Sequence, residues 1–180
     1  MMTNKSNWRP LALSLTVLGA IARLLPHPPN FAPVGGMSLF AGARLPVWQA
    51  YLVPLALMAI TDPILNAFYG YHAMTVYQLF TYGAFLIAVW IGRRLKSTES
   101  PWKIGAAVLA SSVQFFLITN FGAFLRDYPH TFSGLAACYA AAIPFFDRTL
   151  LSDAFYAGAL FGLHAVLSRV ATRERVAATV

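Results

Sequence analysis

Side chains that suit the binding of a small molecule gather in short stretches between long apolar runs. The largest set combines a carboxylate, an amide, an imidazole and phenols, and consists of Asp62, Asn66, Tyr69, Tyr71, His72 and Tyr77. An ionisable group beside such apolar runs pairs with another charge or marks a substrate path. We therefore expect Asp62 to contribute to a binding site, the alternative being that it caps a helix or pairs with an arginine.

A proline-rich run is the second candidate. Four prolines stiffen the stretch from Pro26 to Pro33, which also contains His27, Asn30 and Phe31. Proline restricts its own backbone and that of the residue before it. The run therefore predicts a preformed cap over a pocket, and an interhelical strap that touches no ligand is the alternative.

A third candidate lies near the end of another apolar run, where Asn120 is followed by Phe121, Gly122 and Tyr128. An amide beside aromatic surface is typical of ligand pockets, and also of the aromatic belt at a membrane interface. The sequence contains no zinc-binding His-Glu-x-x-His, phosphate-binding glycine loop or nucleophile-elbow motif. We expect binding rather than catalysis, and no cofactor.

The composition indicates which elements must position these residues. Hydrophobic residues make up 58% of the chain and charged residues 11%, against about 45–50% and 25% in soluble domains. The expected solvent is therefore a lipid bilayer. The net charge of +7 is not gathered into a basic stripe with base-stacking aromatic residues, so nucleic acid is not an expected partner. Cys138 is the only cysteine, which excludes an intramolecular disulfide, and we expect it to be a packing residue.

Apolar segments follow one another along the chain. They are Pro10–Leu25, Val34–Ala43, Val47–Phe68, Met74–Ile91, Ile104–Phe121, Phe132–Phe146 and Leu150–Ser168. A helix needs about 20 residues to cross the hydrocarbon core of a membrane. By this measure Val34–Ala43 and Phe132–Phe146 are short, and length alone does not decide whether they cross.

Basic residues decide which segments cross. They gather before the first segment, between the fourth and the fifth, and after the last: Lys5 and Arg9; Arg93, Arg94, Lys96 and Lys103; Arg169, Arg173 and Arg175. Lysine and arginine concentrate on the cytoplasmic side of membrane helices, so an even number of crossings separates each cluster from the next. Val34–Ala43 must then cross, and only two of the last three segments can. We take Phe132–Phe146 as the segment that does not cross, because it is short and has Pro144 near its end and the charged Asp147–Arg148 just beyond it.

The expected fold class is all-α and integral to the membrane, with residues 1–180 as a single transmembrane domain. We predict six transmembrane helices plus one short re-entrant or interfacial helix, Phe132–Phe146, with both termini in the cytoplasm. Asp153 is expected to cap the last helix.

Small residues at every fourth position form two ridges on the expected helices. One ridge lies on the first helix and the other on the last: Ala12, Thr16 and Ala20; Ala154, Gly158 and Gly162. Small side chains allow helices in a membrane to approach closely. We expect both ridges to pack inside the protein, with docking of a partner as the alternative.

Four stretches carry a resemblance to a known family: Pro29–Gly36, Asp62–Tyr77, Ile118–Gly122 and Cys138–Phe146. In these stretches the chain resembles the substrate-binding S components of energy-coupling factor vitamin transporters, within a group of small bacterial membrane proteins. The resemblance implies six helices, a pocket on the extracellular side closed by the first, third and fifth loops, and toppling within the membrane on a shared ATPase module. Thr16 is a departure, because those proteins often carry Ala-x-x-x-Ala on the first helix.

The resemblance also implies a ligand class. The chain is similar to solitary cobalamin carriers in which a side chain of the third loop coordinates cobalt, and His72 has a comparable place. Imidazole nitrogen suits such a metal. The resemblance therefore makes a corrinoid (cobalamin) the first ligand to test, with His72 as its cobalt ligand.

The expected function is that of a substrate-binding component for uptake of a vitamin or similar small molecule across the bacterial cytoplasmic membrane. Its expected partners are the small molecule, the lipid bilayer, and either an energy-coupling ATPase module or no module at all. An intramembrane enzyme and a structural or assembly protein are the alternatives. The residues expected to bind the substrate are His27, Asn30, Phe31, Asp62, Asn66, Tyr69, Tyr71, His72, Tyr77, Asn120 and Tyr128.

Overall fold

The computed structural model describes residues 8–26, 28, 30–69, 76–96 and 98–177. These residues form α-helices and no strand. The helices are α1 (Arg9–Ala22), α2 (Val34–Arg44), α3 (Val47–Tyr69), α4 (Val76–Arg93), α5 (Pro101–Asp127) and α6 (Phe132–Ala177). The all-α fold that the composition predicted is confirmed for the described part of the chain.

Prolines mark where several helices begin and end. Pro10 and Pro101 lie in the first turns of α1 and α5, where the missing N–H is not needed and the fixed φ suits a helix. At the other end of α2, Leu45 has an extended backbone and precedes Pro46. A residue before proline avoids the helical region, so α2 ends at Arg44.

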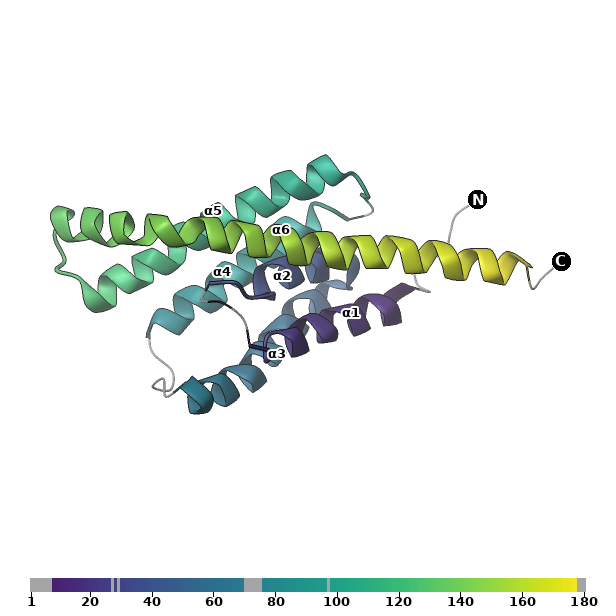
Figure 1. Ribbon diagram of the computed structural model, residues 1–180, viewed down its shortest axis with the longest axis horizontal. Coiled ribbons are helices and arrows are strands. Elements are labelled where there is room, and N and C mark those ends of the chain that lie inside the picture. Colours follow the sequence, from purple (N-terminus) through teal and green to yellow (C-terminus); the bar gives the residue numbers. More distant parts are fainter. Residues whose placement is uncertain (1–7, 27, 29, 70–75, 97, 178–180) are drawn as a thin grey trace.

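Consecutive helices run in alternating directions along the long axis of the molecule (Figure 1). The start of α1, the start of α5 and the end of α6 lie toward one end, and the turn between α5 and α6 forms the other (Figure 1). We call the first the basic end, because Arg44, Arg94 and Arg169 lie there, and the second the hairpin end.

The short helix α2 lies at the centre of the bundle. Every residue from Val34 to Ala43 is buried, and α2 contacts each of the other helices. It crosses α4 at a backbone contact, because a Cβ atom at Gly42 would overlap the Val89 carbonyl and one at Gly92 would overlap the Leu39 carbonyl. The two glycines therefore bring the helix axes closer than larger residues would allow.

Three of the described helices are long and apolar enough to cross a membrane: Val47–Phe68 in α3, Pro101–Asp127 in α5 and Phe132–Glu174 in α6. Their length and composition mark the chain as a helical membrane protein. Helix α2 is different, because its 11 residues extend only about 16 Å at 1.5 Å per residue. That is roughly half of the hydrocarbon core, so α2 depends on its neighbours for its place in the bundle.

The prediction of a separate short helix at Phe132–Phe146 is wrong. The structure continues this segment into the last one as the single helix α6, which has 46 residues and contains Pro144. Pro144 lacks an N–H group and leaves the carbonyl of Ala140 without its helical hydrogen bond, but apolar helices in a membrane tolerate proline where neighbouring groups compensate. At 1.5 Å per residue α6 is about 69 Å long, and the α5–α6 hairpin extends beyond the rest of the bundle (Figure 1).

The two ridges of small residues have different surroundings. Ala12, Thr16 and Ala20 on α1 are buried inside the protein, as expected. The ridge on α6 is exposed at Ala154, Gly158 and Gly162, and a Cβ atom at either glycine would meet nothing within 4 Å. The expectation of internal packing is therefore wrong for the ridge on α6.

Asp153 does not cap its own helix, because it lies well inside α6. Its side chain is buried, with 4% exposed, and it accepts a hydrogen bond from the Ser112 hydroxyl at 2.7 Å and another from the backbone of Gly36. The N-terminus of α2 has no side-chain cap from Pro33. A carboxylate of a neighbouring helix thus takes the capping role, and Gly35 leaves room for it because a Cβ there would overlap Asp153 Oδ1.

Candidate functional site

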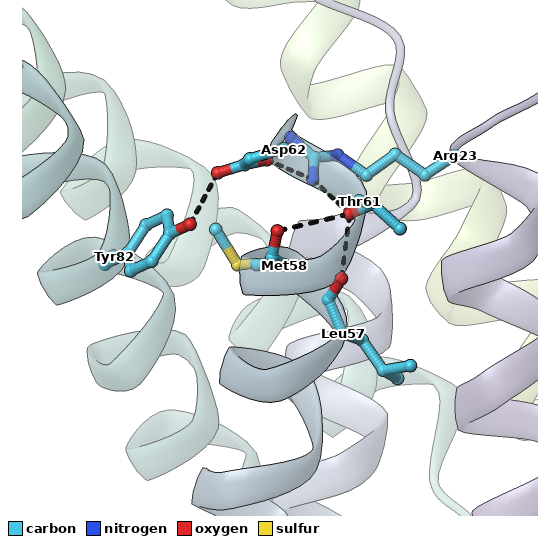
Figure 2. Close-up of polar contacts among 6 residues, drawn as sticks. All are labelled: Arg23, Leu57, Met58, Thr61, Asp62 and Tyr82. Carbon is cyan, nitrogen blue, oxygen red and sulfur yellow. Dashed lines mark hydrogen bonds and ion pairs between the residues drawn. The ribbon is translucent and has the colours of Figure 1, made fainter. Parts of the chain in front are cut away.

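A polar network joins the residue after α1 to α3 and α4 (Figure 2). Asp62 Oδ1 lies 2.5 Å from Arg23 Nη1, and its Oδ2 accepts a hydrogen bond from the Tyr82 hydroxyl at 2.6 Å. Arg23 Nη1 also donates to Thr61 Oγ1 at 2.7 Å, and Thr61 in turn donates to the Leu57 carbonyl at 2.9 Å. The network ties the segment after α1 to two other helices.

This network shows how Asp62 is used. The exposed fractions of the Arg23 and Asp62 side chains are 18% and 11%, so both charges are largely removed from solvent. Both carboxylate oxygens have partners, and of the two readings of the sequence the structure shows the pairing with an arginine. Asn66, one turn further along α3, is half-buried and lies outside the cavity described next.

A cavity of about 340 Å³ lies toward the hairpin end, between α5, the first part of α6, the start of α4 and Asn30. Its lining combines aromatic rings with hydroxyl, amide and carboxylate groups: Asn30, Tyr77, Phe115, Phe116, Thr119, Asn120, Ala123, Asp127, Tyr128, Cys138, Ala141, Ala142, Phe145, Phe146 and Thr149. Eight of these fifteen residues carry a polar side-chain group, so the lining is more polar than that of most small-molecule sites, which are mainly apolar with a few polar groups.

The aromatic wall of the cavity is held by ring contacts between helices. Phe116 of α5 packs edge to face against Phe146 of α6, with ring centroids 5.2 Å apart, and against Tyr139 at 5.8 Å. The Tyr139 hydroxyl donates to the Leu117 carbonyl at 2.7 Å. Such contacts restrict the rings, so the wall offers a defined stacking surface.

The polar groups of the cavity leave hydrogen-bonding capacity toward it. Asn120 Nδ2 donates to the Phe116 carbonyl at 2.7 Å, which uses one of the donors of its amide and leaves the acceptor oxygen for a ligand. The Cys138 thiol donates to the Asn120 carbonyl at 3.3 Å. Cys138 is buried, as expected of a packing residue, although it also lines the cavity.

A cationic group borders the same cavity. The Arg126 guanidinium lies over the Tyr77 ring, 4.9 Å from its centroid, and is 2.5 Å from Asp127 Oδ2. Both side chains of this ion pair are about half exposed, at 47% and 45%, so a ligand can compete for either charge at little cost. The arrangement suits a polar molecule with a flat ring: the ring stacks on phenylalanine and the polar edge meets amide or charged groups.

The structure brings together four of the residues expected to bind a substrate: Asn30, Tyr77, Asn120 and Tyr128 line the cavity. Asn30 has φ of 62°, in the left-handed region that asparagine tolerates better than most residues. Phe31 instead packs against Phe155 and Tyr156 of α6, with ring centroids 6.1 and 5.9 Å apart. In the described part of the proline-rich run, Asn30 thus lines the cavity and Phe31 connects the run to α6.

The remaining expected residues either lie elsewhere in the structure or are outside its described part. Asp62 and Asn66 lie outside the cavity, as described above. His27, Tyr71 and His72 lie outside the described residues, and so does the side chain of Tyr69. The prediction that His72 ligates cobalt is therefore untested. Within the part of the chain that the structure describes, no three His, Cys, Asp or Glu residues form a group able to hold a metal ion.

Sequence reasoning missed the aromatic wall. Its main members are two phenylalanine pairs, Phe115–Phe116 on α5 and Phe145–Phe146 on α6. The signal was present in the sequence, because both pairs lie in neighbouring apolar segments. It was not used, since phenylalanine in an apolar run packs against lipid or core as readily as against a ligand.

The fold and the cavity define a class: a helical membrane protein with a cavity of small-molecule size between its helices. Over residues 3–176 the chain matches the family of unknown function DUF6580, and it belongs to that family. No curated protein and no solved structure matches the chain.

Proposed function

We propose that this protein binds a small molecule in the cavity between α4, α5 and α6 and serves its uptake across the bacterial cytoplasmic membrane. The observation that carries the proposal is the cavity itself, in which Asn30, Tyr77, Asn120 and Tyr128 meet a phenylalanine wall. Its volume of about 340 Å³ falls at the lower end of the range of about 300–1,000 Å³ for ligand pockets.

The charge distribution supports an orientation for this proposal. The basic clusters at the end of α4, the start of α5 and the end of α6 share the basic end (Figure 1). Positive residues favour the cytoplasm, so in the proposed topology all helices cross, both termini are cytoplasmic and the hairpin end faces outward. The cavity then takes its ligand from outside the cell.

The lining indicates the chemistry of the ligand. Phenylalanine rings favour a flat conjugated ring, and the Asn120 amide and the Arg126–Asp127 pair favour a polar edge. Several vitamins combine a flat conjugated ring with a polar edge. The lining is therefore compatible with the expected transport of a vitamin. A corrinoid stays the narrower prediction, and its macrocycle needs more space than the described cavity offers.

The proposal is tested by the molecules that the protein retains. Purified protein should release a small molecule identified by mass spectrometry, and that compound should raise the melting temperature of ligand-free protein, because binding to the native state alone stabilises it. An intramembrane enzyme would instead convert the compound, and an assembly protein would retain a protein partner and no compound. Either result would contradict the proposal.

Two alanines of α6 provide a matched pair of variants. Ala141 lines the cavity and Ala137 does not, and both are exposed. Ala141→Phe should occupy the ligand space and weaken binding at least tenfold, whereas Ala137→Phe should bind as the wild type does. Equal affinities of the two variants in calorimetry would place the ligand elsewhere.

A further inference from the structure

A second cavity, of about 440 Å³, lies between α5 and α6 toward the basic end. Its walls are mostly small and apolar, with Ile104, Gly105 and Val108 on α5 facing Gly158 and Gly162 on α6. We call it the α5–α6 groove. It is separate from the cavity at the hairpin end, with which it shares no lining residue.

The groove is open along the side of the molecule. Gly105, Gly158 and Gly162 are exposed, and a Cβ atom at any of them would meet nothing within 4 Å. In a membrane this face meets lipid rather than water. The ridge of small residues on α6 therefore borders a space that hydrocarbon must fill, because an empty apolar groove loses packing contacts on one side.

The shape of the groove admits a lipid. An acyl chain is narrow enough to lie in it along the glycines, and a lipid also carries a charged headgroup at one end. The charges at the end of the groove therefore decide between a lipid and a partner helix.

The end of the groove carries positive charge. Arg44 lines it, with its guanidinium 4.9 Å from the centroid of the Phe161 ring. Arg44 donates to the Leu95 carbonyl at 3.3 Å and to the Thr98 carbonyl at 2.7 Å. A guanidinium has five N–H groups, so these two bonds leave donors for an anionic oxygen.

A second arginine reaches the same end of the groove. Arg169 lines it together with Glu99, and the two side chains pair at 2.6 Å, with 69% and 55% of them exposed. An ion pair this exposed contributes little free energy, so Arg169 can turn to another anion. A phosphate suits guanidinium groups because it accepts paired hydrogen bonds.

We propose that the α5–α6 groove binds one anionic glycerophospholipid, with an acyl chain along Gly105, Gly158 and Gly162 and the phosphate between Arg44 and Arg169. The proposal goes beyond the uptake function and does not depend on it. Basic pockets between membrane helices on the cytoplasmic side take anionic headgroups, and the apolar walls account for the rest of the lipid.

Native mass spectrometry of the purified full chain tests the proposal. The probes are phosphatidylglycerol and phosphatidylcholine with identical acyl chains. The wild type should bind one phosphatidylglycerol at least fivefold more tightly than phosphatidylcholine. Arg169→Gln should weaken phosphatidylglycerol binding about fivefold, the value expected for one basic residue at a membrane surface, and leave phosphatidylcholine binding unchanged.

Two matched controls separate the groove from general effects. Arg173, one turn beyond Arg169 on α6, does not line the groove, so Arg173→Gln should retain the preference. Gly158→Leu should fill the groove and lower the affinity for both lipids. A Cβ atom at Gly83 on α4 would also meet nothing within 4 Å, so Gly83→Leu controls for the loss of a helix glycine and should bind as the wild type does.

Several results would overturn the proposal. Equal binding of the two lipids by the wild type would show that the charged end plays no part. Equal binding by Gly158→Leu and Gly83→Leu would place the lipid outside the groove. Displacement of phosphatidylglycerol by millimolar inorganic phosphate would show that the site binds anions and not the lipid as a whole. If the wild type is a dimer, and Gly158→Leu dissociates it while Gly83→Leu does not, the groove is the contact with a second copy of the chain.

Discussion

At the scale of single residues, the charges of the bundle are used to join helices. The Arg23–Asp62 pair connects the segment after α1 with α3, and Tyr82 adds α4 to the same carboxylate. A charge largely removed from solvent is costly when its partner is lost, because the desolvation penalty remains. We therefore expect the removal of either Arg23 or Asp62 to lower the free energy of unfolding.

Asp62→Asn should leave the Arg23 guanidinium without its counter-charge and lower the free energy of unfolding by about 3 kcal/mol. Reversible unfolding by urea or sodium dodecyl sulfate in mixed micelles measures this change. Tyr82→Phe removes one hydrogen bond to a charged group and should cost about 1.5–3 kcal/mol.

A double-mutant cycle checks the assignment of the pair. Arg23→Gln combined with Asp62→Asn should be less destabilising than the sum of the single changes, because the second substitution removes a charge that the first left unpaired. Strictly additive losses would mean that the two side chains do not interact in the membrane.

At the scale of elements, close contact between backbones holds the central helix. Helix α2 is buried along its length, and Gly42 and Gly92 place it against α4. A larger residue at either glycine would overlap main-chain atoms of the facing helix. Main-chain atoms cannot move away by a change of rotamer, as the end of a flexible side chain can. Overpacking at this crossing should therefore be more costly than at a side-chain contact.

Gly42→Ala should lower the free energy of unfolding by about 3 kcal/mol, at the upper end of the usual range for overpacking. Gly105→Ala is the matched control, since nothing lies within 4 Å of a Cβ at that position. The control should be neutral or up to about 1 kcal/mol more stable, because alanine favours a helix over glycine. Similar melting temperatures for both variants would argue against the close crossing of α2 and α4.

At the scale of the whole molecule, the proposed topology follows from the gathering of basic residues at one end. Thr98 lies between α4 and α5 at the basic end, and Ser133 lies in the first turn of α6 at the hairpin end. The two positions should therefore face opposite sides of the membrane.

Cysteine labelling in intact cells tests this arrangement, after Cys138 has been replaced by alanine. A membrane-impermeant maleimide should react with Ser133→Cys and not with Thr98→Cys, because in the proposed topology only the hairpin end faces outward. Permeabilised cells provide the control, in which both positions should react. Labelling of Thr98→Cys from outside would require a different number of crossings.

The sequence by itself determined the helical membrane class and most helix positions. The apolar segment Val47–Phe68 matches α3, and Val34–Ala43 matches α2. These features follow from local composition, because each apolar run must satisfy its own backbone as a helix wherever it is placed in lipid. The predicted break after Phe146 is wrong: proline and a charged pair are signals of helix ends in soluble proteins, whereas an apolar segment in lipid must satisfy its backbone as a helix, and α6 is continuous.

Only the tertiary structure decided which side chains meet. It paired Asp62 with Arg23, used Asp153 to cap α2, and left the α6 ridge beside an open groove. It also gathered Asn30 and Asn120 around one cavity. Each outcome depends on the rotation of a helix about its own axis and on the neighbour it faces. Apolar membrane helices carry little amphipathic pattern to encode that rotation, since lipid and protein interior are alike in polarity.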